Sequence, residues 1–329
     1  MFKIVAKLLF FMLIFSNIIL ADTEKEMDKP REIKEDLKIK IWDKKKRSQN
    51  DIEKKIIAEY TRIIKTFSAY RPSSIVTKLN QSASLRPVKV TQEVIDIINW
   101  ASKISEQTKG VFDITTASFR WQYGFGHSDY RVPTALHLDQ IKSLVNHKYI
   151  VLYKEEKEIL FKREGVQIDL EDFINLYALN QIEKILETHK PKGARIEIKE
   201  DIIIWGKIDD YLTEIMIFHP EDKKKLITTT TLKTGKLLKI GYCEKSFKHE
   251  GERYHTILDA RTGRPVKHTR AAILKLPLKS KQVFPPSVLL LLPLSEAMAL
   301  VEKSADLEAM FITDLGEVKY SKRWKKTKK

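Results

Sequence analysis

The residues best suited to metal binding or nucleophilic chemistry are spread thinly over the 329-residue chain. A zinc site needs several histidine or cysteine ligands close together. The eight histidines form no i, i+4 pair, and none stands at ligand spacing from the single cysteine, Cys243: His127, His137, His147, His189, His219, His249, His255 and His268. A serine nucleophile would need a G-x-S-x-G turn, which the sequence lacks. The sequence therefore predicts no zinc centre, no serine hydrolase and no intrachain disulfide.

Carboxylates stand at two places where local structure would hold them in fixed positions. Asp169 and Asp172 come at the start of a predicted helix, where acidic groups cap the backbone and interact favourably with the helix dipole. Asp259 precedes Thr262-Gly263, which has the composition of a tight turn after a strand. Helix capping and turn formation account for these aspartates without a catalytic or ligand-binding role. The residues alone therefore leave the function open.

Hydrophobic spacing predicts a mixed α/β (α+β) domain. Apolar residues recur every three or four positions over 52–67, 94–104 and 170–185, which favours three amphipathic helices. Pro285-Pro286 would begin a buried apolar helix kinked at Pro293. Short β-branched or alternating segments predict strands at 148–153, 158–162, 194–198, 202–205, 227–232, 273–276 and 310–313. The Gly124/Gly126 pair lacks the strand-to-helix context of a dinucleotide-binding loop.

Composition divides the chain into four parts. Residues 1–21 have a positive start and an apolar run, as in a secretory signal peptide or an uncleaved membrane anchor. Residues 22–50 are charged and predict a linker, 51–321 the folded domain, and 322–329 a basic tail. The net charge of +16 is mostly interleaved with acids, so we predict no nucleic-acid partner and membrane contact only through an uncleaved N-terminus. The protein is expected to be exported, either periplasmic or anchored in the inner membrane.

Four segments in order resemble the motifs of one family. They are FSAYRPSSIVTKLN at 67–80, TKGVFDITTASFRWQYGFG at 108–126, IDLEDFINLYALN at 168–180 and YHTILDARTGRPV at 254–266. The chain is similar to the ApbE family of FAD:protein FMN transferases. The resemblance implies two α/β subdomains with FAD in the cleft between them. It also implies transfer of FMN to a Ser or Thr hydroxyl of a target protein, or hydrolysis of FAD to FMN and AMP, with a divalent metal.

The same resemblance implies a set of flavin-site residues. Tyr70 would line the flavin, and the segment Val111, Phe112 and Asp113 would contact the adenosine part. The remaining positions that match the motifs are Asp169, Asn175, Ile257, Asp259, Thr262 and Gly263. Each has a structural alternative, because the same residues could anchor a loop, cap a helix or form a turn.

The chain departs from the family pattern where phosphate and metal would bind. In the motif "DLGGIAKGYAVD", the two glycines are replaced by Glu171 and Asp172 and the lysine by Asn175. The histidine of the final motif is Thr256, and the "GGN" and "TSGdY" motifs correspond to residues 199–201 and 239–243. The metal-ligand positions correspond to Phe284 and Val288, and no Asp or Glu lies between residues 271 and 295.

These losses predict a degenerate family member with FAD as a ligand or substrate, no Mg²⁺ site and no assigned catalytic residue. Hard cations such as Mg²⁺ need oxygen ligands, and acids at a helix start repel a pyrophosphate. Two alternatives stay open: an active FMN transferase with a rebuilt metal site, and a non-catalytic envelope interaction protein. The partner would be a flavin-accepting or an envelope protein.

Overall fold

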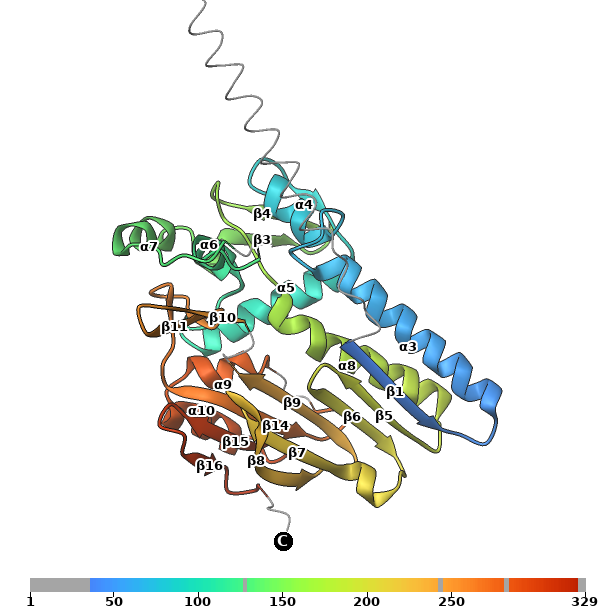
Figure 1. Cartoon of the computed structure of the whole chain (residues 1–329). Helices are drawn as coiled ribbons and strands as arrows, with labels where there is room; N and C mark the ends of the chain where they lie inside the picture. The colour runs from blue at the N-terminus through green and yellow to red at the C-terminus, as the bar shows by residue number, and fades with distance from the viewer. Residues whose placement is uncertain (1–35, 127–128, 242–244, 281–283, 325–329) are drawn as a thin grey trace, which may run out of the picture.

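The computed structural model describes residues 36–126, 129–241, 245–280 and 284–324. A seven-stranded antiparallel sheet forms the larger half of the molecule (Figure 1). Its order is β1 (Leu37–Trp42), β5 (Gly193–Ile198), β6 (Asp201–Gly206), β9 (Gly235–Gly241), β14 (Thr269–Leu276), β15 (Glu308–Thr313) and β16 (Val318–Tyr320). Successive side chains of these strands alternate between the two faces, so the sheet carries a core on each side.

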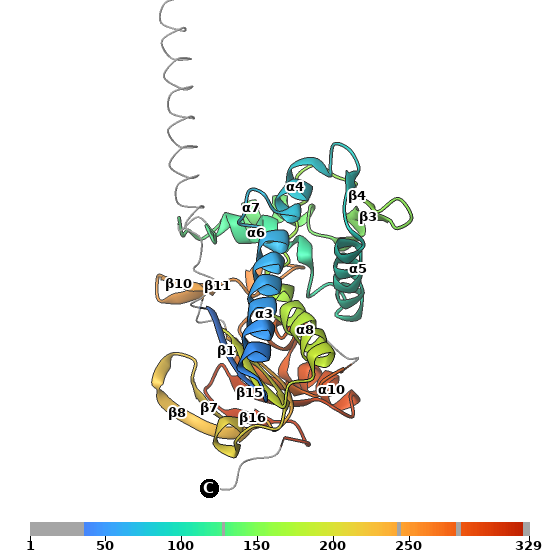
Figure 2. The same cartoon turned by 90° about the vertical axis from the view of Figure 1, so that its right-hand side faces the viewer.

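Helices cover one face of this sheet. α3 (Lys46–Phe67) and α8 (Glu171–His189) lie side by side (Figure 2), and α9 (Ser287–Leu291) and α10 (Leu294–Lys303) extend the same layer. α3 follows its predicted apolar stripe and buries Ile52, Ile56, Tyr60, Ile63 and Phe67. The kink predicted at Pro293 is a full break in the structure, because Pro293 separates α9 from α10.

A hairpin of β7 (Glu214–His219) and β8 (Asp222–Thr231) covers the other face. Ile215 and Ile217 point from the hairpin toward Ile273 and Ile312 of the sheet in a second core. The predicted strand at 227–232 is therefore confirmed as part of β8. This face receives none of the long helices, so the two faces of the sheet differ in their covering.

A smaller group of elements, drawn above the sheet in Figure 1, carries most of the aromatic segment 108–126. Its three-stranded sheet has the order β2 (Val88–Lys89), β4 (Glu158–Phe161), β3 (Ile150–Tyr153), which confirms the predicted hairpin. Around it lie α4 (Ile75–Ser82), α5 (Gln92–Gln107), η1 (Ile114–Thr116), α6 (Ala117–Gln122), α7 (Ala135–Lys142) and η2 (His147–Tyr149). Helices and strands do not alternate regularly along the chain, and this confirms the predicted mixed α/β class.

Short strands connect the two groups. β10 (Ser246–His249) pairs with β11 (Glu252–His255), and β12 (Leu258–Asp259) pairs with β13 (Arg264–Pro265) around a tight turn. The short 3-10 segment η3 (Asp210–Thr213) lies between β6 and β7 along the chain. The segment 254–266 therefore forms the strand and turn that its sequence predicts.

The predicted boundary between the linker and the folded domain is wrong. Residues 37–50 are not a linker: β1 pairs with β5 at the edge of the large sheet, and α3 already begins at Lys46. The alternation Leu37, Ile39, Ile41 gives β1 an apolar face to pack, while its lysines face outward. The predicted signal or anchor at 1–21 lies outside the described residues, and no described helix is long and apolar enough to cross a membrane.

The predicted basic tail is also shorter than its composition indicated. Trp324 is buried, and the ammonium nitrogen of Lys275 lies 4.1 Å from the centroid of its ring. Lys322 forms a salt bridge of 3.2 Å with Glu302. An aromatic side chain within a basic run can bury a large apolar area, and Trp324 packs into the core cluster on the hairpin-covered face of the sheet.

Candidate functional site

A buried arginine forms the centre of the candidate site. Arg120 of α6 donates from Nη1 to Asp169 Oδ2 at 2.7 Å and from Nη2 to Asp172 Oδ2 at 3.1 Å. Its Nε donates to the carbonyl oxygen of Thr256 at 3.2 Å. One guanidinium thus joins α6, the start of α8 and the segment before the tight turn. Its side chain is 9% exposed and that of Asp169 is 2% exposed, so water competes little for these contacts.

The first turn of α8 carries a third carboxylate. Glu171 accepts a hydrogen bond from Ser68 Oγ at 2.8 Å, and Lys245 Nζ lies 3.8 Å from its other oxygen. Asp169 is not the N-cap residue as predicted, because Leu170 occupies that position. Asp169 nevertheless accepts from the Glu171 backbone N–H at 2.8 Å, so it satisfies a free donor of the helix start while it binds Arg120.

Tyr70 lies beside this acidic cluster. Burial, together with the negative charge of Asp169, raises the pKa of the Tyr70 hydroxyl well above its usual value, so the phenol stays neutral. The ring rests against Gly126, where any Cβ would collide with it, and Gly126 has φ of +100°. Gly126 therefore allows the close approach of the Tyr70 ring, which lies next to several charges.

The segment 111–114 connects the cluster to the tight turn. Val111 accepts from the Ala260 N–H at 3.0 Å, and Ile114 accepts from the Asp169 N–H at 2.9 Å. Phe112 is buried against Phe173 of α8 with ring centroids 5.7 Å apart. These backbone bonds fix the start of α8 and the turn relative to each other.

Asp113 has its carboxylate fully engaged within the protein. One oxygen accepts from the backbone and hydroxyl of Thr115, and the other contacts the backbone N–H and the ring of His147 at 2.8 and 3.1 Å. The side chain caps the 3-10 turn that follows. The structural alternative for Asp113 is thus observed directly, whereas its adenosine contact stays a prediction.

The tight turn is organised by Asp259. Its carbonyl oxygen accepts from the N–H groups of Thr262 and Gly263 at 3.1 and 2.8 Å, and its carboxylate binds Arg261 at 2.7 Å. Gly263 has φ of +69° and leaves room for the Phe119 ring, against which a Cβ would collide. Residues Thr262 and Gly263 therefore have clear roles in shaping the turn.

A buried histidine holds the base of the same turn. His255 Nε2 lies 3.0 Å from the carbonyl oxygen of Val266, while Nδ1 accepts from the N–H of the buried Ile257 at 3.3 Å. This arrangement assigns the proton to Nε2. Burial lowers the pKa of His255 to about 4, so the ring is neutral at pH 7.

Asn175, the last predicted site residue, belongs to a different contact. Its side-chain amide donates to Asp201 Oδ2 at 3.1 Å, and Asp201 also accepts from the Lys239 N–H at 2.8 Å. The amide ties α8 to the large sheet. The structure therefore brings Tyr70 and Asp169 together, joins them through 111–114 to the turn at 257–263, and gives Asn175 a separate partner.

The positions predicted for metal ligands do not fit a divalent cation. Phe284 and Val288 are both buried and carry no oxygen. Ser287 between them has a buried hydroxyl without a hydrogen-bond partner, but one hydroxyl does not make the oxygen cage that Mg²⁺ requires. Among the described residues, no group of three or more His, Cys, Asp or Glu side chains could hold a metal. The family metal is thus not supported by the residues present.

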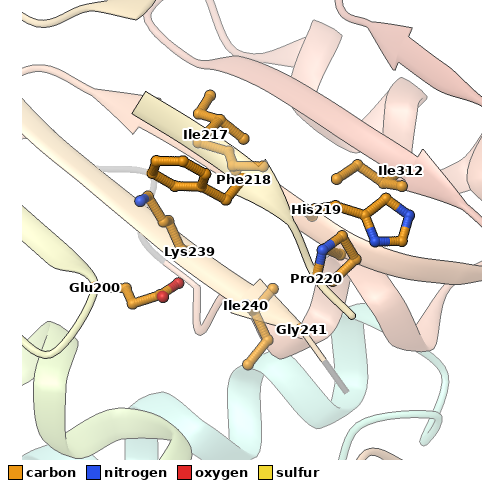
Figure 3. Close-up of a pocket in the computed structure, with 12 residues that line it drawn as sticks. Glu200, Ile217, Phe218, His219, Pro220, Lys239, Ile240, Gly241 and Ile312 are labelled. Atoms are coloured by element: carbon orange, nitrogen blue, oxygen red, sulfur yellow. The ribbon is translucent and has the colours of Figure 1, made fainter. Parts of the chain in front are cut away.

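A pocket on the hairpin-covered side of the sheet is lined by none of the ten predicted site residues; Figure 3 shows its lining side chains. It has ≈ 590 Å³ of empty space, part of it open to solvent. Phe218 and His219 of β7 line it together with Lys239 of β9, and Glu200 stands at its margin. Its lining includes parts of 199–201 and 239–243, the segments that correspond to the "GGN" and "TSGdY" motifs.

Sequence reasoning missed the residue with the most contacts in the cluster. Arg120 is the single charged residue in an aromatic-rich run, ITTASFRWQYGF, and a charge inside a segment that is buried indicates a buried partner. That signal was available. Ser68 and His147 had no comparable signal, because their partners are distant in sequence and their residue types are common in loops.

Comparison with known proteins identifies the family of the chain. The ApbE family model matches residues 34–311. The chain belongs to the ApbE family. It is 24% identical over 247 residues to an FAD:protein FMN transferase of Klebsiella pneumoniae, covering 74% of this chain and 76% of that protein. With the Escherichia coli K12 FAD:protein FMN transferase it shares 21% identity over 68% of this chain and 65% of that protein.

Solved ApbE structures share the fold. The apo flavinyl transferase ApbE of Pseudomonas stutzeri superposes with a TM-score of 0.74 at 19% identity, covering 87% of this chain and 91% of that one. The ApbE protein of Thermotoga maritima gives 0.70 at 23% identity, covering 83% and 90%. The family resemblance and the mixed α/β class predicted from sequence are therefore confirmed. The flavin roles of the individual residues stay predictions.

Proposed function

We propose that this chain is an exported ApbE-family protein that binds a flavin but transfers FMN from FAD weakly or not at all. The observation that carries the proposal is the acidic start of α8, where Glu171 and Asp172 replace the motif glycines. Acids at this helix end would repel a pyrophosphate that the helix dipole would otherwise attract. The chain would thus bind a flavin, as the family does, but without the family's efficient transfer of FMN.

The apolar metal positions support the same conclusion. Cleaving a pyrophosphate depends on neutralising the charge that develops on phosphate oxygens, and a divalent metal usually supplies this. Phe284 and Val288 offer no oxygen for such a metal. By contrast, Tyr70 and the turn residues Asp259, Thr262 and Gly263 still match the family motifs. A scaffold can persist while its site chemistry is lost.

The test follows AMP release and flavin fluorescence together. Purified protein is incubated with FAD and Mg²⁺, and we expect a change in flavin fluorescence without AMP release above a protein-free blank. AMP release would favour an active transferase with a rebuilt metal site. Absence of any flavin binding would favour the non-catalytic envelope interaction protein.

A restoration variant sharpens this test. Glu171→Gly and Asp172→Gly reopen the helix start, and Phe284→Asp with Val288→Thr returns oxygen ligands. We expect Mg²⁺-dependent AMP release to appear in this fourfold variant. The matched control carries the same glycines with Phe284→Ala and Val288→Ala, which remove bulk without adding ligands. Equal activity in both variants would contradict the metal explanation.

A further inference from the structure

The start of α3 and the end of α8 together form a strongly basic surface, which we call the basic end. Lys55 Nζ lies 2.8 Å from Nε2 of His189, the last residue of α8, so the two helix ends are in contact. β1 ends opposite Gly193, which brings Lys192 to the same end of the molecule. The basic end consists of eight exposed side chains: Lys44, Lys45, Lys46, Arg47, Lys54, Lys55, Lys190 and Lys192.

The basic end borders a shallow groove with ≈ 900 Å³ of empty space, which includes open solvent. Its lining comprises Lys45, Arg47, Lys54, Lys55 and His189, with Asp51 as the acidic member. None of the eight cations forms a salt bridge with an acid of the described residues, whereas Lys267 pairs with Glu252 and Lys322 with Glu302 elsewhere on the surface. The positive charge of the basic end is therefore open to a partner.

The cations at the start of α3 do not help that helix to form. Its first turn contains no acid but carries Lys46 and Arg47, and the N-cap residue Lys45 makes no side-chain capping bond. Positive charges at a helix N-terminus oppose the helix dipole, which favours acids there. Asp43 offsets part of this, because it accepts a hydrogen bond from Ser48 Oγ at 2.6 Å. The cluster thus has a charge pattern that suits an external anion better than it suits the fold.

The basic end is distant from the candidate flavin site. α8 runs for 19 residues from its acidic start to His189, a length of about 28 Å. Figure 1 shows the start of α3 at the opposite end of the molecule from α6 and α7. A partner bound at the basic end therefore leaves the flavin site free, and the inference does not rest on the proposed function.

An anionic membrane surface fits the basic end best. The cations are spread over an open surface instead of converging on one point, which suits many lipid headgroups. Residues 1–21 have the composition of a signal or anchor, and residues 22–35 connect them toward β1. Extended, residues 22–35 reach roughly 50 Å, and β1 spans about 20 Å between that segment and the basic end. An anchored chain is therefore long enough to rest the basic end on the same membrane.

We propose that the basic end docks on the anionic headgroups of a lipid bilayer. This contact adds to the one predicted for an uncleaved N-terminus and orients the folded domain, with the start of α3 and the end of α8 toward the bilayer. Binding is electrostatic, so it requires anionic lipid and weakens as salt screens the charges.

The first experiment titrates the full chain with neutral phosphatidylcholine vesicles and with vesicles that contain one-third phosphatidylglycerol. Neutral vesicles report the contribution of residues 1–21, and the preference for anionic vesicles reports the basic end. The test variant carries Lys45→Gln, Lys46→Gln, Arg47→Gln and Lys54→Gln. We expect it to lose about 30-fold or more of the wild-type preference, since each basic residue near an anionic surface strengthens binding roughly fivefold.

A matched control loses the same charge from the smaller group of elements. It carries Lys78→Gln, Lys103→Gln, Lys142→Gln and Lys148→Gln, all at exposed positions. We expect this control to keep the wild-type preference in low salt, and high salt to remove the preference from both. Equal losses in the two variants would assign the binding to net charge and overturn the proposal, as would a wild type without any preference. Tighter binding of a DNA duplex through the same four residues would identify a nucleic-acid surface instead.

The second experiment asks whether the four cations serve the fold. Thermal unfolding of the test variant and the wild type is compared without vesicles. We expect the test variant to have a Tm equal to or above that of the wild type, because the substitutions remove charges that repel one another and oppose the dipole of α3. A Tm lower by several degrees, or a failure to fold, would show that these residues stabilise the domain and would contradict the proposal.

Discussion

Arg62 and Arg120 make nearly the same contacts in two different places. Arg62 joins Glu59 and Glu93 with N–O distances of 2.8 and 2.6 Å on the surface, where its side chain is 43% exposed. Arg120 joins Asp169 and Asp172 at 2.7 and 3.1 Å inside the protein, where its side chain is 9% exposed. Arg62 makes two hydrogen bonds to each glutamate and Arg120 makes one to each aspartate, so the exposed arginine has the better geometry and burial is what favours the other.

This difference in burial decides how much a carboxylate–arginine contact contributes to the free energy of unfolding. On the surface, water solvates each group almost as well as its partner does, and the contact adds about 1 kcal/mol or less. Inside the protein neither charge can return to water, so loss of one partner leaves the other without solvation. The effect of burial can therefore be tested by substituting a buried and an exposed residue of the same type.

The largest expected effect is that of Arg120→Gln. Removing the guanidinium leaves Asp169 and Asp172 unpaired, and we expect a loss of about 3–5 kcal/mol in the free energy of unfolding. Urea unfolding measured in EDTA tests this, because no cation can then replace the arginine. A loss below about 1 kcal/mol would mean that water reaches the cluster and that the buried pair behaves like the surface one.

The second effect concerns the buried imidazole of His255. Its folded-state pKa of about 4 lies below the ordinary value of 6.5, so the unfolded chain binds the extra proton between these pH values. Stability should therefore be intact above about pH 6.5 and fall by about 3 kcal/mol as the pH drops toward 4.

Unfolding measured across this pH range checks the prediction against two variants. His255→Gln removes the buried imidazole and should flatten the profile between pH 6.5 and 4. His249→Gln removes an exposed imidazole and should keep the wild-type slope, because His255 is still present. A steep profile in His255→Gln would assign the acid sensitivity to other groups.

The third effect compares two glycines with positive φ. Gly263 (φ +69°) would place a new Cβ against the Phe119 ring, whereas Gly316 (φ +80°) would place one in open space. Gly316→Ala carries only the backbone penalty of about 1 kcal/mol, and Gly263→Ala adds the collision, for about 2–3 kcal/mol in total. Thermal unfolding of the two variants gives the difference, and equal losses would show that Phe119 moves aside freely.

The smallest effect is expected for Arg62→Gln. Despite its several hydrogen bonds to Glu59 and Glu93, this arginine is open to water, and its removal should cost about 1 kcal/mol or less. The loss should shrink further in high salt, since exposed charges are screened. A loss comparable with that of Arg120→Gln would remove burial as the explanation for the comparison.

Much of the fold could be predicted because it depends on local periodicity. The apolar stripes of α3, α5 and α8 recur every three or four residues, and the hairpin and most strands follow from short β-branched runs. β1 was missed because its alternation covers only six residues within a strongly charged stretch, and its stability comes from pairing with β5, far along the chain. Trp324 was missed for the same reason, since its partner Lys275 is distant in sequence.

The candidate site divides in the same way. The turn at Asp259–Gly263 and the cap at Asp113 follow from residues within a few positions, so the sequence indicates them correctly. Arg120 meets Asp169 and Asp172 across a separation of about fifty residues. No local pattern specifies which acid a buried arginine will find.

The sequence by itself therefore determined the family, the mixed α/β class, the main helices and the absence of any Asp or Glu between residues 271 and 295. Only the tertiary structure decided that the acids at the start of α8 receive a guanidinium, and that Tyr70 lies beside them. The physical reason is that side-chain period and turn chemistry act within a few residues, whereas the partner of a buried charge depends on which distant segments the folded chain brings together.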